Sequence, residues 1–309
     1  MNDPQSTVDV LCVGQAPYDL TFTIDRHPQP DEKMFATALH QCGGGPAANA
    51  AVAVARLGHS SAFAGYLGQD AFGDLHFQEL VADDVQTSLI VRGTVQTPLS
   101  VSLVKLDGSR ALVNYGGNQR PLPAHSIDFS HCHPRVIIFD GWEPDISPPL
   151  AQWARQAGIP TILDAGSVHR GTEALAPLVD YLIGAEKFGR TFTGEADPVR
   201  AAAKLSELGG TAVIITLGSQ GLVWQKGGES GHLPAFPVET VDTTGAGDAF
   251  HGAFAAGLVR GLAWNDLLRF ASAVAALTCT KMSARLAIPE ETAVQKFLEK
   301  SGNRVAGGG

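Results

Sequence analysis

The sequence predicts an α/β fold in which a mostly parallel sheet carries helices on both faces. Short apolar runs of strand length alternate with longer helical patterns along most of the 309 residues, as expected when crossover helices join parallel strands. The chain is 44% hydrophobic and 17% charged, a composition that can fill a large core. We therefore expect a single domain over residues 1–309.

The expected elements follow from local signals in chain order. The first strand ends at Gly14, and Gly43-Gly44-Gly45 then opens a helix that has Pro46 in its first turn. The predicted strands of the main sheet are 8–13, 61–66, 136–139, 161–163, 181–183 and 212–216. The predicted helices are 46–57, 72–81, 149–157, 199–208, 246–260, 264–280 and 289–300.

Two segments do not fit this alternation and predict a small separate β-sheet. Runs 99–106 and 111–115 have strand character, and Asp107-Gly108 between them is a strong hairpin signal. With the irregular segment 21–39, they indicate a lid formed by about residues 17–40 and 96–118. Because an exposed sheet edge invites pairing with another subunit, we also expect a homodimer.

Charge and cysteine usage exclude several classes of protein. The formal net charge of −9 disfavours a protein that grips nucleic acid through its phosphates. The cysteines are scattered without a C-x-x-C pair, and the first residues lack a signal-peptide pattern. No uninterrupted apolar run approaches the length of a membrane span, and no P-loop motif occurs. We therefore expect a cytoplasmic protein without nucleic-acid or membrane partners.

The most informative stretch is Val241–Phe250, at the start of a predicted helix. Gly245, Ala246 and Gly247 are small, and backbone N–H groups in the first turn of a helix have no partner within it. A phosphate could approach those donors at the positive end of the helix dipole. Asp248 follows in the same turn and could accept the proton of an incoming hydroxyl. The alternative is an ordinary turn followed by an acidic residue at a helix start.

Two long motifs resemble the signatures of the ribokinase-like (PfkB) kinases. Asp242-Thr243-Thr244-Gly245-Ala246-Gly247-Asp248 resembles the C-terminal signature, and the stretch from Gly43 to Gly58 resembles the N-terminal one. The resemblance implies a ribokinase-like three-layer α/β/α sandwich and transfer of the γ-phosphate of ATP to a carbohydrate hydroxyl. It implies that Asp248 is the catalytic base and that Gly245, Ala246 and Gly247 form the anion hole.

The resemblance also implies a nucleotide site and its ions. Thr216, Gly218, Ser219 and Gly221 match the nucleotide loop, T-x-G-x-x-G. Many members carry an N-x-x-E motif that organises Mg²⁺ through water, whereas this chain has Ala185-Glu186-Lys187-Phe188. Glu186 and Lys187 are thus candidate nucleotide contacts or solvated residues of a helix start, and Mg²⁺ is still expected with ATP.

A monovalent cation, typically K⁺, often lies beside the anion hole in this family. Asp242 and Thr244 match the positions that hold it, although Asp242 could instead be a capping residue. A later loop usually completes the site, and here it reads Thr280-Lys281-Met282-Ser283-Ala284, with Ser in place of Gly. Dependence on K⁺ is therefore an open question.

On the acceptor side, Asp19 matches the residue that holds a sugar hydroxyl. Gly44, Gly45 and Asn49 match the loop that meets the small-molecule sugar, and Lys33 and Asn114 of the lid could contact its polar end. The nearest resemblance is to the ketohexose and sulfofructose kinase branch. Trp142 stands where a sulfonate-binding Arg is expected, so a neutral sugar is an equal alternative as the acceptor. A nucleoside kinase and a non-catalytic sugar or nucleotide sensor are the alternatives. Asp25, Arg110 and Trp142 are expected to be structural.

Overall fold

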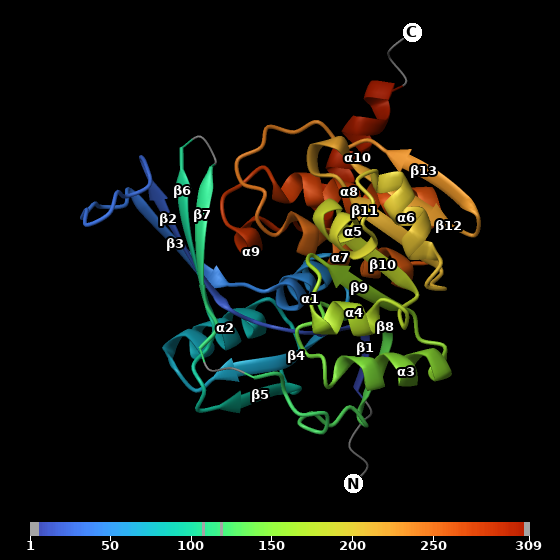
Figure 1. Ribbon diagram of the computed structural model, residues 1–309, viewed down its shortest axis with the longest axis horizontal. Helices are drawn as coiled ribbons and strands as arrows, with labels where there is room; N and C mark the ends of the chain where they lie inside the picture. The colour runs from blue at the N-terminus through green and yellow to red at the C-terminus, as the bar shows by residue number, and fades with distance from the viewer. Residues whose placement is uncertain (1–5, 107–108, 118–119, 306–309) are drawn as a thin grey trace.

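The computed structural model describes residues 6–106, 109–117 and 120–305 and has the predicted layered architecture (Figure 1). Within these residues, the large sheet has nine strands in the order β13-β12-β11-β10-β9-β8-β1-β4-β5. The strands are β1 (Ser6–Val13), β4 (Ser61–Gly68), β5 (Ile90–Gly93), β8 (Cys132–Phe139), β9 (Thr161–Ala165), β10 (Tyr181–Ala185), β11 (Ala212–Thr216), β12 (Leu222–Lys226) and β13 (Glu229–Leu233). The strands from β11 to β5 pair in parallel, and β12 and β13 extend the edge in antiparallel fashion.

Helices cover both faces of the large sheet. The helices are α1 (Pro46–Arg56), α2 (Ala71–Ala82), α3 (Ser147–Ala157), α4 (Arg170–Leu175), α5 (Glu186–Thr193), α6 (Pro198–Ser206), α7 (Ala246–Val259), α8 (Trp264–Thr278), α9 (Ala284–Ala287) and α10 (Glu291–Val305). Strand residues alternate between two cores, so that Val10 and Cys12 face α1, α7 and α8, while Leu11 and Val13 face α3 to α6. This is the expected three-layer arrangement.

A second, four-stranded sheet stands away from the large one (Figure 1). Its order is β3-β2-β6-β7, from β2 (Tyr18–Ile24), β3 (Ala38–Gly43), β6 (Leu99–Lys105) and β7 (Arg110–Tyr115). The strands come from the two segments that did not fit the alternation. The Asp107-Gly108 turn lies outside the described residues. That this sheet acts as a lid stays a prediction.

Close packing of α1 against α7 brings together two segments that are far apart in the sequence. A Cβ atom on Gly252 of α7 would lie 2.6 Å from the Ala50 carbonyl oxygen and 2.7 Å from the Ala53 Cβ atom. Both helices begin after a glycine with positive φ, 93° at Gly45 and 77° at Gly245. The two glycine loops therefore lie close to each other.

No helix of the described residues is long and apolar enough to cross a membrane.

The α1–α7 contact predicts a cost for adding a single methyl group. Gly252→Ala gains about 1 kcal/mol of helix propensity but forces its Cβ atom into the α1 backbone, so we expect a net loss of about 1–2 kcal/mol in the free energy of unfolding. Urea denaturation measures this change. Gly302→Ala in α10 is the control, because a Cβ atom there meets open space and should cost nothing. Equal stability of Gly252→Ala and the unmodified protein would contradict the account.

Candidate active site

The first turn of α7 forms a cradle of backbone donors. A Cβ atom at Gly245 would lie 2.7 Å from that of Ala284, so the turn requires glycine both for space and for its positive φ. The Ala249 N–H makes the first bond of the helix ladder, to the Gly245 carbonyl at 2.9 Å. The N–H groups of Gly247 and Asp248 precede that bond, and a Cβ atom on Gly247 would meet open space. An anion can therefore approach this helix end closely.

Asp248 lies beside this cradle and is tied to α1. Its Oδ2 atom accepts a hydrogen bond from Asn49 Nδ2 at 2.7 Å. Burial raises the pKa of Asp248, while the Asn49 hydrogen bond and the charges of His251 and Arg285 act in the opposite direction. The carboxylate is thus held in one orientation by a residue from the other glycine-opened helix.

The glycine loop before α1 makes room for Asp19. A Cβ atom on Gly44 would lie 2.2 Å from Asp19 Oδ2, so the loop backbone lies directly on this carboxylate. Burial raises the pKa of Asp19 to about 7, helped by the nearby charges of Asp248 and Glu79 and opposed by Arg285. The structure therefore brings Asp19, Gly44, Asn49 and Asp248 together, as the sequence predicted.

Two buried residues of the same region were missed by the sequence analysis. Asp140, directly after β8, accepts hydrogen bonds from the backbone N–H groups of Gln15 and Trp142, both at 2.9 Å, and its pKa is raised to about 8 by burial. Arg285 is only 1% exposed and donates to Asn49 Oδ1 at 3.2 Å. Each lies next to a recognised loop, but Gln15 and Asn49, the partners that tie them to the site, are far away in the sequence. A lone Arg in an apolar stretch was the only available signal.

The expected nucleotide loop lies at the neighbouring strand ends. Gly218–Gln220 forms a short 3₁₀ turn after β11, with positive φ at Gly218 (58°) and Gly221 (89°). Thr216 donates to the Gly184 carbonyl at 3.4 Å, while Ser219 is exposed. Glu186 and Lys187 begin α5 directly after β10 and are also exposed. These candidates thus follow two adjacent parallel strands.

A buried histidine joins α7 to the same strand ends. The Nδ1 atom of His251 lies 2.6 Å from the Gly247 carbonyl oxygen and 3.3 Å from Asp164 Oδ2, and Nε2 lies 3.2 Å from the Ile183 carbonyl oxygen. Asp164 belongs to β9 and Ile183 to β10. The helix end that carries Asp248 is therefore anchored next to the predicted nucleotide loop.

The loop before α7 already provides partners for the Asp242 carboxylate. Its Oδ1 atom accepts from Thr244 N at 2.9 Å and Thr244 Oγ1 at 2.7 Å, and Oδ2 accepts from Ser283 N at 3.1 Å. Arg110 of β7 donates to Thr244 Oγ1 and lies 3.9 Å from Asp242 Oδ1. Ser283 has a φ of 75°. These bonds link the loop before α7 to the loop before α9, and Asp242 is not a cap of α7, whose N-cap residue is Gly245 without a side-chain cap bond. That Asp242 and Thr244 hold a monovalent cation stays a prediction. No group of three or more His, Cys, Asp or Glu in the described part of the chain could hold a metal ion.

Two lid candidates stay apart from these residues. Lys33 and Asn114 are exposed, and Lys33 Nζ lies 5.8 Å from the centre of the Phe35 ring. Among the described residues, no hydrogen bond or ion pair joins either side chain to Asp19 or Asp248. Asn114 lies two strands from Asp19 in the small sheet, because both residues pair with Ser100 of β6. Contact of Lys33 and Asn114 with the acceptor stays a prediction.

Comparison with known proteins identifies the family. The profile of the pfkB family carbohydrate kinases matches residues 8–291. The chain belongs to the pfkB family. Ribokinase from Arabidopsis thaliana is 31% identical over 97% of this chain and 84% of its own. Ribokinase from Bacillus subtilis is 28% identical over 94% of this chain and 99% of its own. The structure of Arabidopsis thaliana ribokinase complexed with ribose and ATP matches with a TM-score of 0.84 and 28% identity, covering 95% of this chain and 99% of that one.

Membership in the pfkB family confirms the predicted fold and enzyme class. The protein is a phosphotransferase with an alcohol group as acceptor, and it acts on carbohydrates. Its relatives named above are ribokinases, so they do not support the expected ketohexose and sulfofructose branch in particular.

The raised pKa of Asp19 predicts pH-dependent stability. A carboxyl group with a higher pKa in the folded state stabilises the protein at low pH, and that contribution is lost as the pH rises through about 7. Asp19→Asn removes the titration. We expect the difference in melting temperature, variant minus unmodified protein, to increase as the pH rises from 5 to 8. Thermal denaturation of both proteins across this range measures the difference, and parallel curves would contradict the prediction.

Proposed function

We propose that this pfkB protein is an ATP-dependent sugar kinase in which Asp248 is the general base. The observation that carries the proposal is the position of Asp248, which lies between the N–H cradle of α7 and the Asn49 side chain of the acceptor loop. One carboxylate can thus contact the acceptor hydroxyl while the transferring phosphoryl group rests on Gly245, Ala246 and Gly247. Backbone donors fixed in this way stabilise the charge of the transition state.

For the acceptor, we infer a pentose of the ribose type bound between the glycine loop and the small sheet. The names of the relatives support ribose, and the Arabidopsis thaliana structure contains ribose and ATP. Asp19, Gly44, Gly45 and Asn49 would hold its hydroxyl groups, with Lys33 and Asn114 reaching it after closure of the lid. Trp142 leaves the site without the third arm of a sulfonate clamp, which argues against a sulfosugar.

For the nucleotide, we infer that ATP lies along Thr216, Gly218, Ser219 and Gly221. A Cβ atom on Gly218 would meet open space, so the loop backbone is accessible there to a ribose or phosphate group, whereas Gly221 is packed against the Leu233 carbonyl oxygen. Lys187 could meet a phosphate as a point charge, and Glu186 could contact water around the ion. Mg²⁺ bound to ATP would neutralise phosphate charge during the transfer. Lid closure would exclude water and limit hydrolysis.

A homodimer stays a prediction with one supporting observation. The small sheet exposes apolar side chains on β7 and β3, namely Leu112, Val113, Tyr115 and Leu39. These residues lie on the two opposite edge strands of the small sheet, and an exposed sheet edge can pair with another chain.

Substitution of the base separates a kinase from a non-catalytic sensor. Asp248→Asn keeps the size of the side chain but cannot accept the proton, so we expect turnover to fall by at least about 10³-fold. ATP and sugar affinity, measured by calorimetry, should change by less than about fivefold. An active Asp248→Asn variant would contradict the proposed base. Loss of binding together with loss of folding would mark Asp248 as a structural cap instead.

The charge of Arg110 predicts a weak response to monovalent cations. This guanidinium already faces Asp242 and Thr244, so exchanging K⁺ for choline should change the rate of the unmodified enzyme by less than about threefold. Arg110→Ala should increase that response, because the carboxylate then lacks a cation. ADP release in the two salts measures both effects. Strong K⁺ dependence that Arg110→Ala leaves unchanged would contradict the prediction.

A further inference from the structure

Arg285 is the largest fully buried side chain among the described residues, and the mechanism proposed above does not use it. It belongs to the short helix α9, and only 1% of it is exposed. A buried guanidinium is costly unless its N–H groups have acceptors. The acceptors around Arg285 therefore indicate what it holds in place.

The groups that accept hydrogen bonds from Arg285 belong to the glycine loop before α1, to α1 itself and to α2. Arg285 Nε donates to Asn49 Oδ1 at 3.2 Å, and Nη1 donates to Glu79 Oε2 at 3.3 Å. Nη2 lies 2.8 Å from His76 Nε2 and 3.5 Å from the Gly44 carbonyl oxygen. Burial and the charge of Arg285 hold the pKa of His76 well below its usual range, so its ring is neutral and can accept at Nε2.

The glycine loop is shaped around this arginine. A Cβ atom on Gly43 would lie 2.1 Å from Arg285 Nη1 and 2.4 Å from the His76 ring. Glu79 supplies the opposing charge, and its carboxylate also accepts from Gly43 N at 2.6 Å and from the Tyr18 hydroxyl at 3.2 Å. The guanidinium is therefore fixed from several sides and cannot rotate freely.

The contact with Asn49 determines which way its amide faces. An amide has one accepting oxygen and one donating nitrogen, so an oxygen bound to the guanidinium leaves the nitrogen for Asp248. The reversed amide would place its N–H groups against Arg285 and its oxygen against the Asp248 carboxylate, and both contacts would be repulsive. Arg285 thus selects the amide orientation that donates to Asp248.

We propose that Arg285 is a positioning residue for phosphoryl transfer, acting through Asn49 to hold the Asp248 carboxylate toward the acceptor hydroxyl. The inference rests on the proposed role of Asp248. It links Glu79, Arg285, Asn49 and Asp248 in one line of contacts from α2 to α7. Small displacements of a reacting group are expensive, since a shift of about 1 Å can cost about 10²-fold in rate.

The test is a double-mutant cycle in kcat. Arg285→Gln and Asn49→Ala should each lower kcat by about 30- to 100-fold, because each lets the Asp248 carboxylate turn. The double variant should be little slower than either single one, since both remove the same hydrogen-bonded contact. The KM for ATP should stay within about twofold of the unmodified enzyme, because the nucleotide loop is untouched.

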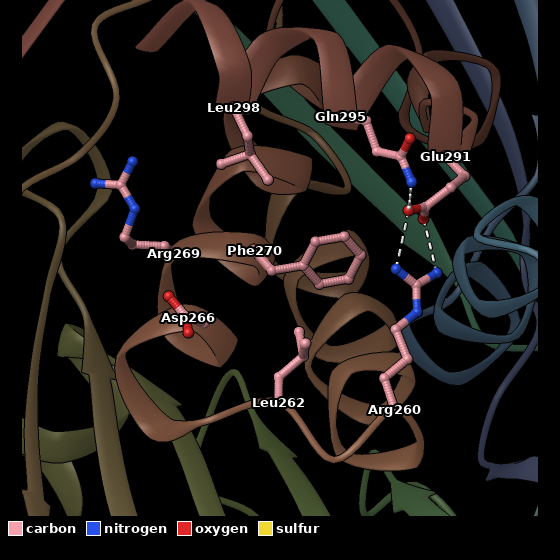
Figure 2. Close-up of a pocket in the computed structure, with 8 residues that line it drawn as sticks. All are labelled: Arg260, Leu262, Asp266, Arg269, Phe270, Glu291, Gln295 and Leu298. Carbon is pink, nitrogen blue, oxygen red and sulfur yellow. Dashed lines mark hydrogen bonds and ion pairs between the residues drawn. The ribbon is translucent and has the colours of Figure 1, made fainter. Parts of the chain in front are cut away.

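Arg260 provides the matched control. It lies at the other end of α7 in a hollow lined by Leu262, Phe270 and Leu298, where its guanidinium pairs with Glu291 at 2.7 and 2.9 Å (Figure 2). Arg260→Gln removes a guanidinium–carboxylate pair whose arginine side chain is 25% exposed, and it should lower the melting temperature while leaving kcat within about twofold. When kcat is measured well below the melting temperatures of all variants, an effect on the position of Asp248 is separated from an effect on stability. If Arg285→Gln does not fold, Arg285→Lys keeps the buried charge and carries the same test.

The outcomes separate this inference from the proposed function. Losses of kcat that multiply in the double variant, or an Arg285 variant no slower than Arg260→Gln, would overturn the role of Arg285. An active Asp248→Asn variant would instead overturn the proposed base, whatever the Arg285 variants do. Strong coupling between Arg285 and Asn49, with an inactive Asp248→Asn variant, is the result we expect.

Discussion

Close packing of α1 against α7 is the constraint on which the site depends. The small residues Ala50, Ala53 and Gly252 let the two backbones approach, and this approach places Asn49 within 2.7 Å of Asp248. Each helix starts at a glycine with positive φ. The first turn of α7 offers backbone N–H groups there, whereas α1 begins with Pro46, which has no N–H, and its Ala47 N–H donates to Asp140 Oδ2 at 3.4 Å. A larger side chain at this contact would separate the glycine loop before α1 from the N–H cradle of α7, although the sequences of the two glycine motifs would stay the same.

Charge balance at the acceptor end is the second constraint. Burial raises the pKa values of Asp19 and Asp248, the charge of Asp248 raises that of Asp19 further, and the buried cation Arg285 opposes both shifts. A chain of net charge −9 can still receive a polyphosphate here, because the donors at α7 are backbone N–H groups whose dipoles do not depend on overall charge. In the proposed complex, the carboxylates would face the sugar, whose hydroxyl groups can donate to them.

Local sequence patterns predicted most of the fold and the two glycine loops, because helix starts and buried strands depend on neighbouring residues. The predicted helix 46–57 is α1 within one residue, and the predicted strand 212–216 is β11. The short or half-buried elements β5, β12, β13, α4 and α9 were missed, since few residues carry their pattern. Arg285 and Asp140 were missed because their partners are set by the tertiary fold. Lys33 and Asn114 were proposed from resemblance, and the described contacts do not join them to Asp19.

The most direct test of the account is ADP release by the purified protein with Mg-ATP across a panel of acceptors. The panel contains ribose and other pentoses, ketohexoses, sugar phosphates, sulfofructose and nucleosides. The account predicts that a pentose raises ADP release at least about 100-fold above hydrolysis without acceptor, because only a bound hydroxyl can reach Asp248. Binding of both ATP and ribose without any acceptor-dependent ADP release would contradict it and would favour a sensor.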